Sequence, residues 1–72
     1  MKTIIRQLRQ DRGMTQLQLA ELVHVSARTI ISIEKGQYSP SLMLAYRMAR
    51  VFGVPVEELC CLEENLKQEE EL

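Results

Sequence analysis

The 72-residue sequence predicts an all-α domain of five short helices, and three observations favour that class. Apolar residues recur every three or four positions within short segments, which is the spacing of one helix face. β-branched residues do not alternate with polar residues, as they do in half-buried strands. The only Phe is Phe52 and Trp is absent, so small aliphatic side chains are expected to fill the core. A chain of this length forms one domain.

The first helix is expected over residues 3–12, with Thr3 as its cap and Gly13 as its stop. Its apolar side holds Ile4, Ile5 and Leu8, and its opposite side holds Arg6, Arg9 and Arg12.

The second helix is expected to begin after Thr15, which forms a capping box with Gln18. Its predicted buried face consists of Leu19, Ala20, Leu22 and Val23. His24 follows in a turn, where a positive φ is expected and His tolerates it better than most residues. The alternative, that His24 is a metal ligand or a pH sensor, has no second His or acidic cluster to support it.

Ser26 is expected to cap the third helix, and Val25 and Ile30 form a hydrophobic staple around that cap. Ile30 and Ile33 are predicted to point inward, and Gly36 ends the helix. The outward side is left with Ala27, Arg28, Ile31 and Ser32.

A loop over residues 37–40 leads to a fourth helix capped by Ser39 or Ser41 and ended by Gly53. Its predicted buried stripe consists of Leu42, Ala45, Met48, Ala49 and Phe52.

Pro55 is expected to start a fifth helix, which has Glu57 and Glu58 in its first turn. Residues 1–62 are predicted to form the folded domain, and residues 63–72 an acidic tail that is frayed or disordered. Alternatively, Leu59, Leu62 and Leu66 extend the fifth helix into the tail.

Charge is divided unevenly along the chain, although the net charge is only −1. Residues 1–50 contain eight of the nine Lys and Arg residues, and residues 51–72 contain seven of the ten acidic residues. A basic body favours an anionic partner, and the alternative is that the charges only keep two surfaces soluble.

The sequence contains neither an apolar run long enough for a transmembrane helix nor a signal-peptide pattern, so a cytoplasmic location without membrane association is predicted. Cys60 and Cys61 are adjacent, which is not the spacing of a metal motif or a disulfide framework. They are interpreted as small apolar residues, with redox cross-linking between subunits as the alternative.

The second helix, the short turn and the third helix form a candidate helix-turn-helix, whose outward face fits the major groove of DNA. Arg28 is the predicted base reader, because a guanidinium can donate to both O6 and N7 of guanine. Ser32 lies one turn later, and Ile31 is either idle surface or a contact to a thymine methyl group. Gln16 is expected to hold a phosphate at the start of the second helix.

These segments resemble the phage-repressor type of helix-turn-helix domain, the lambda repressor and Cro-like or XRE family, over about residues 3–60. The residues that carry the resemblance are Thr15-Gln16, Leu19-Ala20, Val25-Ser26, Thr29-Ile30, Ile33-Glu34, Gly36, Pro40-Ser41-Leu42, Phe52-Gly53-Val54 and Glu58-Leu59. The resemblance implies a five-helix lambda-repressor-like fold, in which the third helix reads bases through Ala27, Arg28 and Ser32 while Gln16 holds a phosphate. The full predicted DNA surface is Gln16, Ser26, Ala27, Arg28, Thr29, Ile31, Ser32, Lys35 and Tyr38.

The chain departs from the family pattern at three positions. His24 replaces a usual Gly, Ala27 stands where a longer polar residue is common, and Cys60 replaces a frequent aromatic residue. The loss at Ala27 removes one expected DNA contact, so specificity depends more on Arg28, Ser32 and a second subunit.

The predicted function is that of a transcriptional regulator, most simply a repressor, which binds an inverted-repeat operator as a homodimer. The predicted dimer residues are Val56, Leu59, Cys60 and Leu62. An alternative is an antitoxin-like module that binds a partner protein and regulates its own expression. An enzyme is disfavoured, because one His and no phosphate loop or zinc spacing leave no catalytic set. No cofactor, metal or small-molecule site is expected.

Overall fold

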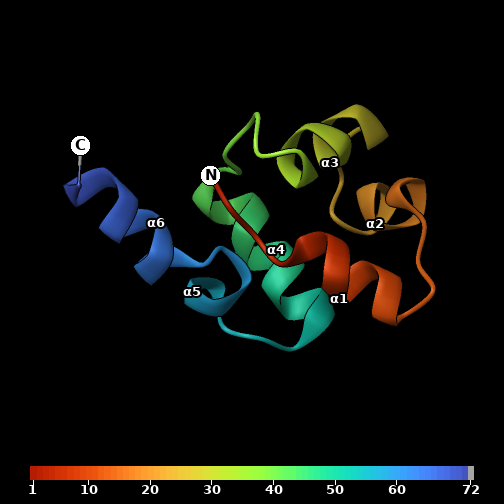
Figure 1. Ribbon diagram of the computed structural model, residues 1–72. Coiled ribbons are helices and arrows are strands. Elements are labelled where there is room, and N and C mark those ends of the chain that lie inside the picture. The colour runs from red at the N-terminus through yellow and green to blue at the C-terminus, as the bar shows by residue number, and fades with distance from the viewer. Residues whose placement is uncertain (72) are drawn as a thin grey trace.

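The computed structural model describes residues 1–71, and within them every regular element is a helix (Figure 1). The helices are α1 (Ile5–Asp11), α2 (Gln16–Leu22), α3 (Ala27–Glu34), α4 (Leu42–Phe52), α5 (Val56–Leu59) and α6 (Leu62–Glu70). The predicted all-α class is confirmed, with six helices in this part of the chain rather than five. Figure 1 shows α2 and α3 at one end of the molecule and α6 at the other.

A single aliphatic core holds α1 to α5 together. Each of these five helices contributes at least one fully buried side chain, and α4 contributes the largest number of buried residues. The core consists of Ile5, Leu19, Ala20, Val23, Ile30, Ile33, Leu44, Ala45, Met48, Ala49, Phe52, Leu59 and Cys60. Since burial of a large aliphatic side chain contributes about 1.5–3 kcal/mol, this set supplies most of the driving force for folding.

The prediction of burial in the core is wrong for two residues. Leu22 and Leu42 are exposed, at 55% and 76% respectively, and Leu44 is buried in α4 instead. The arc of α4 that packs on the core runs through Leu44 and Met48, and at about 100° per residue Leu42 falls outside it.

Most of the predicted helix ends are confirmed. Thr15 and Gln18 form the reciprocal capping box of α2, and the Ser26 side chain accepts from the Thr29 amide at the start of α3. Ser41, rather than Ser39, caps α4, and Gly53 ends it with φ of 69°. Thr3 is not the N-cap residue as predicted, because α1 begins after Ile4; the Thr3 hydroxyl accepts from the Ile5 amide only at 3.5 Å.

The prediction of a frayed or disordered tail is wrong for residues 63–70, which belong to α6. The alternative of a continuous fifth helix is wrong as well, because Cys61 separates α5 from α6 with a left-handed φ of 48°. Leu72 of the predicted tail lies outside the described residues. The division into residues 1–62 and 63–72 stays a prediction.

A side-chain clamp fixes α6 to the start of the chain. The Asn65 amide nitrogen donates to the Lys2 carbonyl at 2.9 Å, and the Lys2 amide donates to the Asn65 carbonyl oxygen at 2.9 Å. The side-chain amide of Asn65 thus bonds both backbone polar groups of Lys2, and the Lys2–Glu64 ion pair adds a second contact. No residue of α6 is buried, so this clamp and the Asn65 bonds to the Cys60 and Cys61 carbonyls hold the helix in place of core packing.

Candidate nucleic-acid interface

Local backbone chemistry fixes the angle between α2 and α3. The Val25 amide donates to the Ala20 carbonyl at 3.0 Å, the long-range bond of a Schellman-type helix end. His24 takes the predicted positive φ, 62°, which this bond requires. The Arg47 guanidinium of α4 donates to the Val23 carbonyl at 3.1 Å and so satisfies the end of α2. The turn is therefore determined from inside the motif and from α4.

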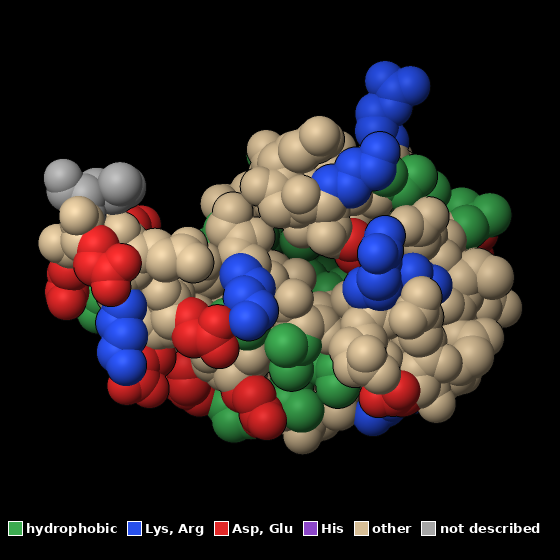
Figure 2. Space-filling view, in the orientation of Figure 1, with side chains coloured by type: hydrophobic (Ala, Val, Ile, Leu, Met, Phe, Trp, Pro, Cys, Tyr) green, Lys and Arg blue, Asp and Glu red, His purple; other side chains and the backbone are tan. Residues whose placement is uncertain are grey.

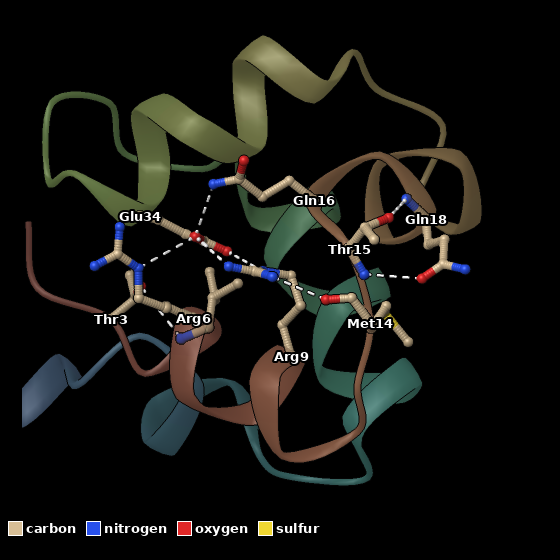
Figure 3. A network of polar contacts seen from close by, with 9 residues as sticks. Thr3, Arg6, Arg9, Met14, Thr15, Gln16, Gln18 and Glu34 are labelled. Carbon is tan, nitrogen blue, oxygen red and sulfur yellow. Dashed lines mark hydrogen bonds and ion pairs between the residues drawn. The ribbon is translucent and has the colours of Figure 1, made fainter.

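A buried ion pair ties α1 to the end of α3 (Figure 3). The Arg9 Nε atom lies 2.7 Å from Oε2 of Glu34, and its Nη2 atom lies 3.0 Å from Oε1, which is the bidentate arrangement. The Glu34 side chain is completely buried. Arg9 also donates to the Met14 carbonyl at 2.8 Å, so the same guanidinium fixes the segment that enters α2.

Two further groups complete this polar network. The Gln16 amide at the start of α2 donates to Oε1 of Glu34 at 3.1 Å, and Arg6 lies 3.6 Å from the same oxygen. Burial alone would raise the pKa of Glu34, but the hydrogen bonds from Arg9 and Gln16 and the charges of both arginines lower it. The hydrogen bond to Glu34 raises the pKa of Arg9 despite its burial. The network therefore stays ionised near neutral pH.

The outward side of α3 borders a hollow of about 420 Å³. It is lined by Ser26, Arg28, Thr29, Ser32, Gln37 and Tyr38. Five of these belong to the predicted DNA surface, and Gln37 is the sixth, from the loop that follows α3. The Ser26 and Thr29 hydroxyls lie 3.1 Å apart and hold the rim of the hollow at the first turn of α3.

The remaining predicted residues lie around this hollow with different exposures. Lys35 is exposed, whereas Ile31 is half-buried and Ala27 is half-buried against the core. Gln16 is half-buried too and reaches Glu34. Arg28, in the first turn of α3, lines the hollow, whereas Lys35, just after the end of α3, does not.

Most Lys and Arg side chains of residues 1–50 bond to groups of the same chain, so only a few of these cations are left to bind an anionic partner. Arg9 is buried, contrary to the prediction that it lies on the solvent side of the first helix. Arg12 donates to the Val51 and Phe52 carbonyls at 2.7 and 2.9 Å, closing the end of α4. Within residues 1–71, the side chains of Arg28, Lys35 and Arg50 make no ion pair or hydrogen bond to another protein group.

Figure 2 shows acidic side chains gathered over α5 and α6, while basic side chains project at the α3 end of the molecule. The electrostatic division of the sequence is thus preserved in space. Because two of the unengaged cations, Arg28 and Lys35, belong to α3 and its end, the positive potential there is available to an anionic ligand.

The roles of Arg9 and Glu34 were missed by sequence reasoning. One signal for them exists, because Glu34 is the last residue of α3, where the helix dipole disfavours a carboxylate. A carboxylate at that position needs a compensating cation, and helix 1 offers three arginines on one side.

The structure also corrects two of the four predicted dimer residues. Leu59 and Cys60 are buried in the core of one chain, so neither is available to a second chain. Burial raises the pKa of the Cys60 thiol, with a smaller effect from Cys61, which makes it a poor group for redox cross-linking. Leu62 is exposed and Val56 is half-buried.

Two further observations concern other kinds of site. Within residues 1–71, no group of three or more His, Cys, Asp or Glu side chains is placed to hold a metal ion. In the same residues, no helix has the length and apolar character needed to cross a membrane.

Two helices joined by a tight turn, with the second presenting polar and cationic side chains beside a hollow, define a helix-turn-helix DNA-binding domain. The helix-turn-helix family model HTH_3 matches residues 5–59, and the chain belongs to this XRE/Cro-like family of transcriptional regulators, which are not enzymes.

Similarity to individual proteins agrees with this assignment. An uncharacterized HTH-type transcriptional regulator of Methanothermobacter thermautotrophicus is 50% identical over 66 residues, covering 90% of this chain and 96% of that protein. Another, of Archaeoglobus fulgidus, is 52% identical over 59 residues, covering 82% and 84%. The cryptic phage CTXphi transcriptional repressor RstR of Vibrio cholerae is 38% identical over 55 residues, covering 76% of this chain and 50% of that protein.

Proposed function

We propose that this DNA-binding transcriptional regulator is a cytoplasmic repressor that binds an inverted-repeat operator as a homodimer, with α3 in the major groove. The observation that carries the proposal is the hollow beside α3, where the Arg28 side chain is exposed and has no ion-pair or hydrogen-bond partner within residues 1–71. A single small module makes few DNA contacts, and two copies related by a twofold axis supply the affinity that specific binding needs.

Arg28 is proposed to select the base pair that contributes most to specificity. A bidentate contact from a guanidinium to guanine discriminates against other bases by about 1–3 kcal/mol. Ser32 lies one helical turn away and lines the same hollow, so it is proposed to contact an adjacent base or phosphate. Ser26 and Thr29 form the rim, and their hydroxyls are proposed to face the DNA backbone.

Gln16 is proposed to bind a phosphate, with its orientation set by Glu34. Its amide nitrogen has two hydrogens, and one of them is engaged by Glu34 at 3.1 Å. The second is left to a phosphate oxygen. Lys35 and Tyr38 are proposed to contact the backbone beside α3, since phosphate contacts set position rather than sequence. Ala27 and Ile31 present the apolar part of this surface, suited to a thymine methyl group.

Selection of bound sequences from a random double-stranded DNA pool tests this proposal. The expected result is an inverted repeat whose half-sites are centred about 10 base pairs apart, one turn of DNA. Enrichment of a single unrepeated half-site would contradict dimeric binding, and the absence of any enriched sequence would contradict specific recognition.

The repressor role is proposed because RstR, a relative covering three quarters of this chain, is named a transcriptional repressor. A reporter gene placed behind the selected operator tests it. Expression of the wild-type protein is expected to lower reporter output, and the Arg28→Ala variant is expected to restore it. Increased output with the wild-type protein would identify an activator instead.

A further inference from the structure

The solvent side of α4 is apolar over its first two turns. Leu42, Met43 and Tyr46 are 76%, 59% and 49% exposed, and the helical spacing of these three residues places them on one face opposite the core. Polar side chains are expected on the outer face of a surface helix. Continuous exposed apolar surface of this kind marks an interaction site.

A second apolar stripe lies on α6. Leu62 and Leu66 are 44% and 54% exposed and are one turn apart, so they share a face of a helix that buries nothing in the same chain. The segment just ahead of α4 lies close to the middle of α6. A hollow of about 280 Å³ is bordered by Ser39, just ahead of α4, and by Asn65 and Gln68 of α6.

The charges beside the two stripes are complementary. Arg50 continues the exposed face of α4 and has no carboxylate within ion-pair distance among residues 1–71. Around the α6 stripe lie Glu63, Glu69 and Glu70, all exposed. Each chain thus has an apolar face on α4 that ends in a cation, and an apolar stripe on α6 that is bordered by carboxylates.

We propose that these surfaces bind a second copy of this chain: the Leu62–Leu66 stripe of each α6 packs on the Leu42–Met43–Tyr46 face of α4 in the other copy, and Arg50 meets the acidic border of that α6. A twofold axis makes both contacts at once, because each copy supplies both surfaces. The inference rests on the proposed homodimeric function, and it replaces the buried Leu59 and Cys60 with exposed residues.

This arrangement leaves the DNA surface free. The residues that line the hollow beside α3 are different from those of the two stripes. Figure 1 shows α6 at the end of the molecule opposite α2 and α3, so α6 can bind a second copy without covering the reading face of its own chain.

Sedimentation equilibrium of the full chain without DNA tests the proposal, and it is independent of whether the protein reads DNA. Wild type is expected to dimerise at micromolar concentration, and Leu66→Glu or Leu42→Glu is expected to raise the dimer dissociation constant at least about tenfold, equivalent to 1.4 kcal/mol. Leu22→Glu is the matched control, because Leu22 is 55% exposed and lies on α2. A monomeric wild type at 100 µM, or an unchanged dimer dissociation constant in Leu66→Glu, would overturn the proposal. Neither result would decide whether the protein reads DNA, which the selection from the random DNA pool tests separately.

A cross-linking experiment decides the case in which a charged variant fails to fold by circular dichroism. One chain carries Leu42→Cys and a second, tagged chain carries Leu66→Cys, both in a Cys61→Ser background. Mixing them under mild oxidation is expected to give a tagged–untagged disulfide species. Exclusive formation of like-with-like species, or of none, would overturn the α4–α6 contact.

Discussion

Different kinds of interaction hold the two ends of this molecule in place. At the α2–α3 end, capped helices, a Schellman-type turn and an ion pair with a completely buried carboxylate determine the backbone. At the α6 end, the Asn65 clamp and an exposed ion pair hold a helix that buries no side chain. The orientation of α3 therefore depends little on α6. The end that carries the helix-turn-helix therefore has the fixed geometry that DNA recognition needs.

The largest expected effect comes from breaking the buried pair. Arg9→Ala removes the partner of a fully buried carboxylate, and loss of one member of such a pair costs about 3–5 kcal/mol. Urea denaturation at fixed protein concentration measures it. Arg6→Ala is the control, because Arg6 is exposed and lies 3.6 Å from Glu34, so it is expected to cost less than about 1 kcal/mol. Equal losses in the two variants would contradict the assigned role of Arg9.

Acidification is expected to weaken the same end of the molecule. The folded pKa of Glu34 lies below its unfolded value, so its contribution to stability is fully present above the unfolded pKa, about 4.3, and is lost as pH falls through the folded pKa. The free energy of unfolding is measured between pH 6 and pH 2. Glu34→Gln should give a smaller decrease with acidification than wild type, even though it is less stable at pH 6. Parallel profiles would show that Glu34 does not carry the acid sensitivity.

Loss of a helix cap has an intermediate effect. Ser26→Ala removes the oxygen that accepts from the Thr29 amide, and such a substitution typically costs about 1 kcal/mol. Ser39→Ala is the matched control, since Ser39 is exposed and Ser41 supplies the α4 cap. Thermal unfolding compares the two, and a loss at Ser39 as large as that at Ser26 would contradict the cap assignment.

The smallest effect on global stability is expected at the α6 end. Asn65→Ala removes the hydrogen bonds to Lys2 and to the Cys60 and Cys61 carbonyls, all at or near the surface. Hydrogen exchange is expected to show loss of protection across α6 alone, with global stability changed by about 1 kcal/mol or less. Simultaneous loss of protection in α2 and α3 would show that the two ends are coupled.

The helices of the DNA-reading end were predictable because local chemistry determines them. Ser26, the Thr15–Gln18 capping box and the glycine stops are read from short spacings, and each is confirmed. The position of α6 was not predictable in the same way. It depends on Asn65 meeting Lys2, two residues at opposite ends of the chain, and no periodicity reports such a contact.

The buried network illustrates a second limit of sequence reasoning. Arg9 appears on the polar side of its helix, and only the packing of α3 against α1 makes that side an interior one. The burial errors at Leu22 and Leu42 have a related cause, because an apolar residue in a helix is assigned to the core unless the packed arc is known. Neither Leu22 nor Leu42 packs in the core. Leu42 belongs instead to the surface that we propose binds a second copy.

The most direct measurement of the central claim, that α3 reads DNA through Arg28, is the affinity of two variants for the selected operator and for all single-base changes at one half-site. Arg28→Ala is predicted to lose about 1–3 kcal/mol on the preferred operator and to lose its preference at one base pair. Lys35→Ala, on the same end of the molecule, is predicted to weaken all sequences uniformly and to reduce the salt dependence. An Arg28→Ala profile that keeps wild-type preference at every position would contradict the account.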